Sequence, residues 1–267
     1  MKWKLSEGRT ESDFSDYKPP YTQAQALAEA NRCLYCHDAP CVRACPTHID
    51  IPQFIHKIST GNIKGSARTI FSANILGYSC ASACPVEELC VGDCVYNALH
   101  VPPIQIGRLQ RYSTEAAVKA DWEFFQAGPD SGHHIALVGA GPASIACAHE
   151  LRRFGHACTI YEKMDVAGGL DVSGIAPYKL KSEDALQEIE WALRIGGISF
   201  VQAEVGKDIS WEELEKRHAA VFVGMGLGPD RRLPGSDRKG VHGAVAWIEQ
   251  MKLGQVDLSG VQHAVVL

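Results

Sequence analysis

The fold class of the second half of this 267-residue chain follows from the stretch Ile135-Ala136-Leu137-Val138-Gly139-Ala140-Gly141-Pro142-Ala143-Ser144. Its apolar residues predict a short buried strand, and its glycines predict a tight turn after that strand. Proline suits the first position of a helix, so Pro142 marks where a helix begins. A strand, a glycine turn and a helix in this order are typical of α/β domains with a parallel sheet.

The alternation of strands and helices continues on the C-terminal side of this stretch. Gly155 predicts the end of the first helix, because glycine readily takes the left-handed conformation of a helix C-terminal cap. This alternation predicts a mainly parallel, Rossmann-like sheet. We expect strands over residues 158–161, 219–223 and 263–267, and helices that begin at Ser182 and Ser210 and that span residues 242–251.

The residues upstream of this stretch predict helices and no clear strand. Thr22 and Gln25 form a capping-box pattern, which marks the start of a helix. Residues 128–132 have the glycine, proline and serine content of a linker. These patterns predict two domains, an α-helical domain over residues 1–128 and an α/β domain over residues 129–267. Further helices are expected over residues 54–58, 66–70 and 110–125.

Composition and charge exclude several classes of protein. Hydrophobic residues make up 46% of the chain and charged residues 21%, as in globular proteins. A net charge of −5 offers no bulk attraction for nucleic acid or for an anionic membrane. The N-terminus lacks the apolar core of a signal peptide, and no apolar run reaches the roughly 18 residues of a membrane span. We expect a cytoplasmic protein.

The glycine turn matches the fingerprint of dinucleotide-binding domains. Gly139 would form the turn, and Gly141 would let backbone amides approach a pyrophosphate at the helix N-terminus. The third position needs a small residue, and Ser144 is a slight departure there. Glu162 follows the second strand, where a carboxylate would bind ribose hydroxyls. A tight turn without a ligand is the alternative interpretation.

The cysteines form the second informative pattern. The chain has ten cysteines, and eight of them lie between Cys33 and Cys94. In a reducing compartment such a group indicates metal ligands rather than disulfides. Each half of the group packs its cysteines within a few residues of one another and contains a Cys-Pro pair, which favours two [4Fe-4S] clusters. Two structural zinc sites are the alternative, although zinc favours two short pairs separated by a longer loop.

These motifs together resemble one protein family. Residues 33–41, the Cys45-Pro46-Thr47 segment, the glycine turn and the pair Gly168-Gly169 are similar to the N-terminal half of dihydropyrimidine dehydrogenase, to its bacterial flavoprotein subunit and to the small subunit of glutamate synthase. The resemblance covers essentially the whole chain. It implies an α-helical ferredoxin-like domain with two [4Fe-4S] clusters, followed by an FAD domain.

The resemblance also implies which residues bind each cofactor. One cluster would take Cys33, Cys36, Cys41 and Cys94, and the other Cys45, Cys84, Cys90 and the amide of Gln110, so that Cys80 stays a spare thiol. The FAD residues would be Gly139, Ala140, Gly141, Pro142, Ala143, Ser144, Glu162, Lys163, Gly168, Gly169, Leu170, Lys179 and Val205. Lys179 stands where the pyrimidine branch has arginine, and lysine cannot make a bidentate phosphate contact.

The function that this family implies is electron transfer. Electrons would pass from NAD(P)H through FAD and the clusters to a partner catalytic subunit or domain, of the dihydropyrimidine dehydrogenase or the glutamate synthase type. No side chain of this chain is an evident acid–base catalyst. The family's NAD(P)H domain would begin where the chain ends, so we expect a nicotinamide site only if that domain is supplied. The alternative is a truncated, non-catalytic cofactor-binding or assembly module.

Overall fold

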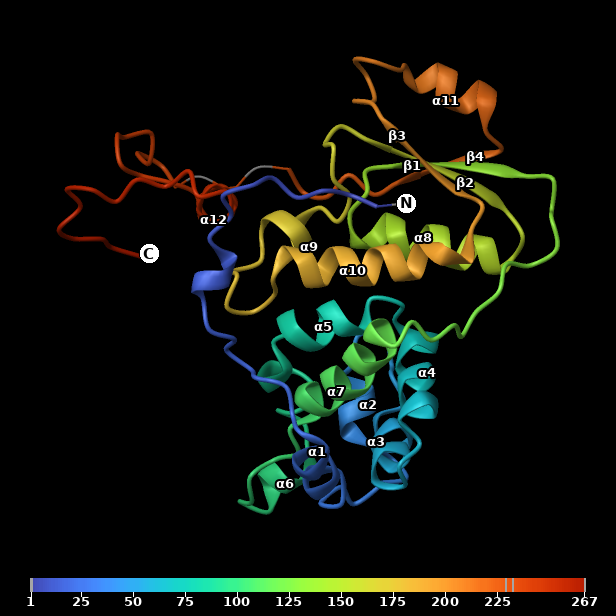
Figure 1. The fold of residues 1–267 in the computed structure, drawn as a ribbon, viewed down its shortest axis with the longest axis vertical. Coiled ribbons are helices and arrows are strands. Elements are labelled where there is room, and N and C mark those ends of the chain that lie inside the picture. The colour runs from blue at the N-terminus through green and yellow to red at the C-terminus, as the bar shows by residue number, and fades with distance from the viewer. Residues whose placement is uncertain (1, 229, 232, 267) are drawn as a thin grey trace.

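The computed structural model describes residues 2–228, 230–231 and 233–266, and it contains a helical half and a sheet half (Figure 1). As predicted, the described residues of the helical half contain helices and no strand. These helices are η1 (Glu11–Asp13), α1 (Gln23–Ala30), α2 (Pro40–Ala44), α3 (Ile51–Ser59), α4 (Ile63–Ala73), α5 (Gly77–Ala83), η2 (Val86–Glu88), α6 (Val95–Ala98) and α7 (Ile106–Lys119).

The sheet half contains a four-stranded sheet with the strand order β3-β2-β1-β4. All neighbouring strands are parallel, as the alternating sequence pattern predicts. Its strands are β1 (His134–Val138), β2 (Ala157–Glu162), β3 (Ile198–Gln202) and β4 (Ala220–Val223). Its helices are α8 (Pro142–Arg153), α9 (Leu170–Ser173), α10 (Ser182–Ala192), η3 (Leu193–Ile195), α11 (Trp211–Arg217) and α12 (Ala244–Lys252).

Local capping interactions explain where several helices begin. Thr22 and Gln25 form the predicted capping box of α1, and Ser210 and Glu213 form one at α11. Pro142 opens α8 as predicted. The helix that we expect to begin with a Ser182 cap instead has Lys181 as its N-cap, because the Ser182 hydroxyl is bonded to Glu11 and to the carbonyl of Val172.

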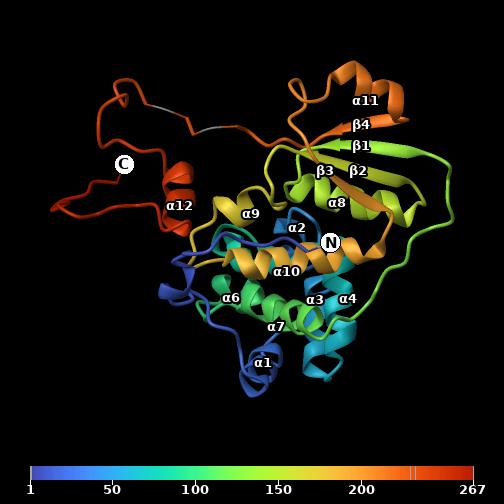
Figure 2. The same cartoon turned by 45° about the horizontal axis from the view of Figure 1, so that its top comes forward.

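One hydrophobic core joins the two halves. Helices α8 and α10 cover one face of the sheet and α11 the other, with α10 next to the helical half (Figures 1 and 2). Leu137 and Ile160 of the sheet pack into the same buried cluster as Ile189 of α10 and as Phe71 and Ala117 of the helical half. The two halves therefore share part of one hydrophobic core.

The expected C-terminal strand is the main correction to the sequence analysis. Residues 263–266 form no strand, and the side chains of Val265 and Val266 are 84% and 96% exposed. A strand needs a neighbouring strand to satisfy its backbone hydrogen bonds, and no described strand pairs with this segment. Leu267, the last residue of the predicted strand, lies outside the described residues. The helix expected over residues 110–125 also ends earlier, at Lys119.

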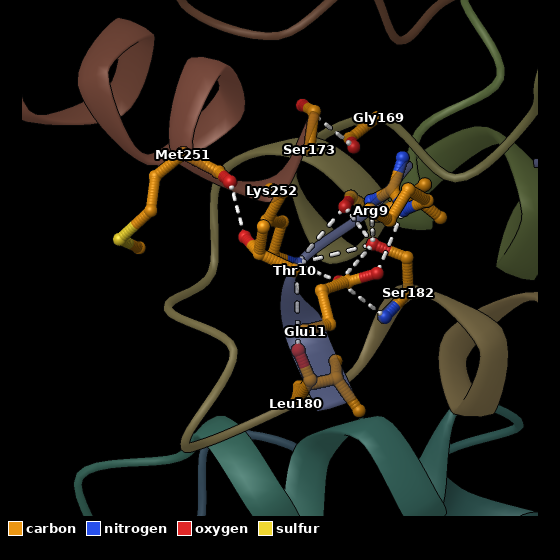
Figure 3. A network of polar contacts seen from close by, with 10 residues as sticks. Arg9, Thr10, Glu11, Gly169, Ser173, Leu180, Ser182, Met251 and Lys252 are labelled. Carbon is orange, nitrogen blue, oxygen red and sulfur yellow. Dashed lines mark hydrogen bonds and ion pairs between the residues drawn. The ribbon is translucent and has the colours of Figure 1, made fainter. Parts of the chain in front are cut away.

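An N-terminal strap, which we define as residues 3–14, crosses the sheet half and ties it to α12. Its Trp3 packs edge-on against Phe200 with ring centroids 5.7 Å apart. Glu11 accepts a hydrogen bond from the Ser182 hydroxyl at 2.7 Å and pairs with Lys252 at 3.4 Å (Figure 3). The side chain of Lys252 is 1% exposed, so this ion pair is buried.

Candidate cofactor sites

A first thiol set consists of Cys33, Cys36, Cys41 and Cys94. These side chains line one pocket of the helical half, although Cys94 is far from the others in sequence. The remaining wall of the pocket is largely apolar and includes Ile51, Ile55, Ile104 and Ile106. The structure thus brings together the four cysteines that the family resemblance assigns to one cluster.

The electrostatics of the first thiol set match the ligand set of a cationic group. Burial raises the pKa of Cys33, and the neighbouring thiols Cys36 and Cys94 raise it further. Burial likewise raises the pKa of Cys41 to about 12, with Cys33 and Cys94 adding to the effect. Thiols that resist ionisation beside one another become thiolates when an iron core supplies positive charge. Soft sulfur donors in an apolar pocket suit an iron–sulfur cluster.

A second thiol set consists of Cys45, Cys84 and Cys90. Burial raises the pKa of Cys90 to about 12, with nearby Cys45 and then Cys41 adding to the effect. The charges of Cys90 and Cys45 also act on Cys84. Since Cys41 belongs to the first thiol set, the two sets lie next to each other.

Two further side chains, Cys80 and Gln110, reach the second thiol set. Cys80 lies one helical turn before Cys84, and the hydrogen bond between the two thiols raises the pKa of Cys80 and lowers that of Cys84. Gln110 is also hydrogen-bonded to Cys80. Its Nε2 donates to the carbonyl oxygen of Gly77 at 2.8 Å. Both residues are therefore placed to serve as a fourth ligand.

The spacing of these side chains differs from that of a site for a single ion. Among the residues that the structure describes, no three His, Cys, Asp or Glu side chains lie close enough together to hold one metal ion. Zinc draws all four ligands onto one atom, whereas a four-iron cluster takes one protein ligand at each iron.

The glycine turn after β1 has two glycines with different roles. Gly139 has a φ of +89°, and a Cβ there would lie 2.7 Å from the carbonyl oxygen of Gly224, so the fold itself requires glycine. Gly141 has a φ of −75°, and a Cβ there would come no closer than 3.9 Å to other protein atoms. Glycine at this second position leaves an open space over the N-terminus of α8, where a pyrophosphate would bind.

Glu162 and the glycine pair meet at this turn. Glu162 accepts hydrogen bonds from the backbone amides of Ala140 at 2.7 Å and Met164 at 3.0 Å. Gly168 donates from its backbone amide to Ala140 at 2.8 Å. A Cβ on Gly169 would lie 3.1 Å from the Cα of Gly141, so these two glycines face each other closely. Glu162, Gly141 and the pair Gly168-Gly169 therefore surround one site at the N-terminus of α8, which we call the cradle.

The other predicted FAD residues lie at various distances from the cradle. Ser144 is fully buried beneath Gly224, whereas Pro142 and Ala143 open α8. Val205 follows β3 and packs beside Tyr161. The remaining three, Lys163, Leu170 and Lys179, are exposed. Nothing in the described contacts connects the side chain of Lys179 to the glycine turn.

Two acidic residues near these sites were missed by the sequence analysis. Glu188 of α10 is fully buried at the boundary between the halves, and burial raises its pKa to about 8. Asp171 lies in the first turn of α9, and burial raises its pKa to about 6 although the charge of Lys252 opposes the shift. In the sequence, no motif distinguishes either residue from the other acidic residues. Only the tertiary structure shows that Glu188 packs against α5 and that Asp171 lies near α12.

The comparisons with known proteins agree with this arrangement. Residues 10–122 match the family model described as dihydropyrimidine dehydrogenase domain II, 4Fe-4S cluster. Residues 137–173 match the model described as an NAD(P)-binding Rossmann-like domain. In the structure, the first match contains both thiol sets and the second contains the glycine turn. No helix among the described residues is long and apolar enough to cross a membrane.

Two bacterial proteins are similar to this chain over most of its length. The NAD-dependent dihydropyrimidine dehydrogenase subunit PreT of Escherichia coli strain K12 is 36% identical over 254 residues, which cover 95% of this chain. The subunit of the same name from Salmonella typhimurium is 34% identical over 255 residues, also 95% of this chain. The chain spans 61% and 62% of the length of these two relatives. Over most of its length the chain is therefore similar to dihydropyrimidine dehydrogenase subunits, and it combines an iron–sulfur domain match with a Rossmann-like domain match.

Proposed function

We propose that this chain transfers electrons, with FAD bound at the glycine turn and a [4Fe-4S] cluster bound at each thiol set. The observation that carries the proposal is the gathering of Cys94 with Cys33, Cys36 and Cys41 around one apolar pocket, next to a second thiol set. Electron transfer needs closely spaced centres, and the two sets are neighbours. Helix α5, which leads to Cys84, packs against the sheet half through α10.

FAD is the nucleotide that best suits this combination of sites. The open space at Gly141 and the carboxylate of Glu162 fit a dinucleotide with a pyrophosphate and a ribose. When bound, a flavin accepts two electrons as hydride and releases them one at a time, which is the form that clusters accept. A nicotinamide alone at this turn would leave the clusters without such a converter.

The chain's own residues hold and orient these groups. The amides at the start of α8 would face the pyrophosphate, while Glu162 would accept hydrogen bonds from ribose hydroxyls. The cysteines would supply thiolates, and Gln110 would supply its amide oxygen as the fourth ligand of the second cluster. The apolar walls of the pocket, such as Ile55 and Ile106, would keep water from the first cluster.

The proposed partner is a catalytic subunit that accepts electrons and reduces a pyrimidine. The support is the printed name of the relatives, which are dihydropyrimidine dehydrogenase subunits that use NAD. By itself the chain would be an oxidoreductase module whose substrates are the electron donor and the partner. We further propose that efficient hydride uptake from NADH or NADPH needs a second nucleotide site, because the glycine turn after β1 is assigned to FAD.

The direct test is cofactor analysis of the chain purified without oxygen. We expect about eight irons and eight sulfides per chain, as two [4Fe-4S] clusters require, and one flavin that is released on denaturation and identified as FAD. Stoichiometric zinc, or about four irons in a fully loaded preparation, would contradict the cluster assignment. Release of a nicotinamide dinucleotide in place of FAD would contradict the flavin assignment.

A further inference from the structure

Glu188 connects the sheet half to the helix that leads to the second thiol set. Its carboxylate accepts hydrogen bonds from the backbone amides of Tyr78 at 2.6 Å and Ser79 at 2.8 Å. These amides belong to the first turn of α5, whereas Glu188 itself lies on α10. The carboxylate therefore satisfies two amide groups that the helix start leaves without partners.

An ionisable carboxyl group at Glu188 is more than this capping role requires. Neutral oxygen acceptors such as serine or asparagine cap helices as well as carboxylates do. The side chain of Glu188 is fully buried, and no described cation forms an ion pair with it. Burying a carboxylate without a cation is costly and raises its pKa, so Glu188 is a titratable group where a serine or asparagine cap would not be.

The contacts of α5 extend from Glu188 to the second thiol set. Gly77, at the first position of α5, accepts the hydrogen bond from Nε2 of Gln110. With Nε2 held in this way, Oε1 is the amide atom left to act as a ligand. Cys80 lies in the next turn of α5, and Cys84 is its C-cap. Fixing the start of α5 therefore fixes the orientation of Gln110 and the position of both cysteines.

On the basis of the proposed function, we propose that Glu188 is a positioning residue for the second cluster, which anchors α5 and Gln110 and whose negative charge lowers the reduction potential of that cluster. An anion close to a redox centre opposes the addition of an electron. Helix α5, which Glu188 caps, leads to Cys84 of the second thiol set and contains no residue of the first, so the first cluster would feel this charge less.

The pH dependence follows from the titration of this carboxyl group. Burial raises the pKa of Glu188 to about 8. Protonation below that pH removes the charge, so the potential of the second cluster rises as the pH falls through about 8. Other titratable groups face this region from each packed element: Asp171 on α9, Tyr78 and Cys80 on α5, and Arg111 on α7, whose charge is paired with Asp16 and Glu115.

The test is a redox titration of both clusters by electron paramagnetic resonance, on the loaded chain at several pH values. In the native chain, we expect the potential of the second cluster to depend on pH around 8 and that of the first cluster to be nearly constant. Glu188→Gln retains the shape and one acceptor oxygen, so above pH 8 the potential should lie higher than in the native chain, and the pH dependence should be lost. Glu190→Gln is the matched control, because Glu190 lies on the same helix but binds the amide of Trp3.

The outcomes separate this inference from the proposed function. A native second cluster whose potential is constant across pH 8 overturns the inference and needs no variant to do so. Equal potentials in the native chain and Glu188→Gln at pH values above 8 also overturn it, while two intact clusters leave the proposed function standing. If Asp171→Asn abolishes the dependence while Glu188→Gln retains it, the charge acts from Asp171 and the assignment to Glu188 is wrong. A chain without clusters instead contradicts the proposed function.

Discussion

Removing the carboxylate of Glu11 tests how strongly the N-terminal strap holds α12 to the sheet half. Glu11 accepts hydrogen bonds from the Ser182 backbone amide at 2.9 Å and from Arg9 Nε at 2.7 Å, in addition to its contact with buried Lys252 (Figure 3). In Glu11→Ala, Lys252 would stay buried without its anion. Its ammonium would keep bonds to the carbonyl oxygens of Val172 at 3.0 Å and Leu180 at 3.4 Å.

The expected loss of stability in Glu11→Ala depends on how far these carbonyl oxygens replace the lost carboxylate as partners of Lys252. Removing one partner of a buried ion pair costs about 3–5 kcal/mol of unfolding free energy. Because Lys252 retains its carbonyl partners, we expect the lower end, about 3 kcal/mol, which corresponds to a loss of roughly 6–12 °C in melting temperature for a chain of this size. Lys252→Met removes the buried cation, so Glu11→Ala should cost less in that background.

The pH dependence of the effect has a definite sign. Burial opposes ionisation of Glu11, but the hydrogen bonds from Arg9 and Ser182 outweigh it and hold the pKa of Glu11 below its ordinary value of 4.5. A carboxylate with a lowered pKa stabilises the fold above pH 4.5 and loses this effect as the pH falls through the folded-state pKa. The native chain and Glu11→Ala should therefore differ at pH 7 and converge in acid.

Thermal unfolding followed by far-ultraviolet circular dichroism measures these differences. Glu7→Ala is the control, since its ion pair with Lys4 is exposed and should contribute little. If Glu11→Ala melts within a degree or two of Glu7→Ala at neutral pH, the reasoning about the buried pair is refuted. Equal costs of Glu11→Ala with and without Lys252→Met would show that the loss does not come from an unpaired lysine.

The remaining predictions concern the cofactors. Gly141→Ala should fold with an unchanged melting temperature but bind FAD less tightly by about 1–3 kcal/mol, because its methyl group occupies the phosphate space; full flavin affinity by fluorescence titration would count against the cradle. Cys84→Ala should lose one cluster by iron analysis whereas Cys80→Ala keeps both, and the reverse result would make Cys80 the ligand. Gln110→Ala should change the paramagnetic signal of one cluster only, and two unchanged signals would reject Gln110 as a ligand. NADH and NADPH should reduce the bound flavin far more slowly than dithionite in stopped-flow experiments, and bleaching at about 1–10³ s⁻¹, as in ordinary enzymes, would reveal an unrecognised nicotinamide site.

Local sequence patterns predicted the elements that form through interactions between residues close together in the sequence. The capping boxes at Thr22 and Ser210 act over three residues, and both are present in the structure. The strand, glycine turn and helix around Gly139 form as predicted because steric limits on φ act within the turn itself. Strand β3 was not predicted, since its alternating exposure at the sheet edge leaves no continuous apolar run.

The sequence by itself determined that the chain has a helical, cysteine-rich half and a parallel α/β half, because helical and strand periodicities and turn residues are local properties. It also placed Cys33, Cys36 and Cys41 within one short segment. Only the tertiary structure brought Cys94 into the same pocket, set Glu188 against the start of α5 and paired Glu11 with Lys252. These residues are far apart in sequence, and the packing of one continuous core, rather than any local preference, decides which of them meet.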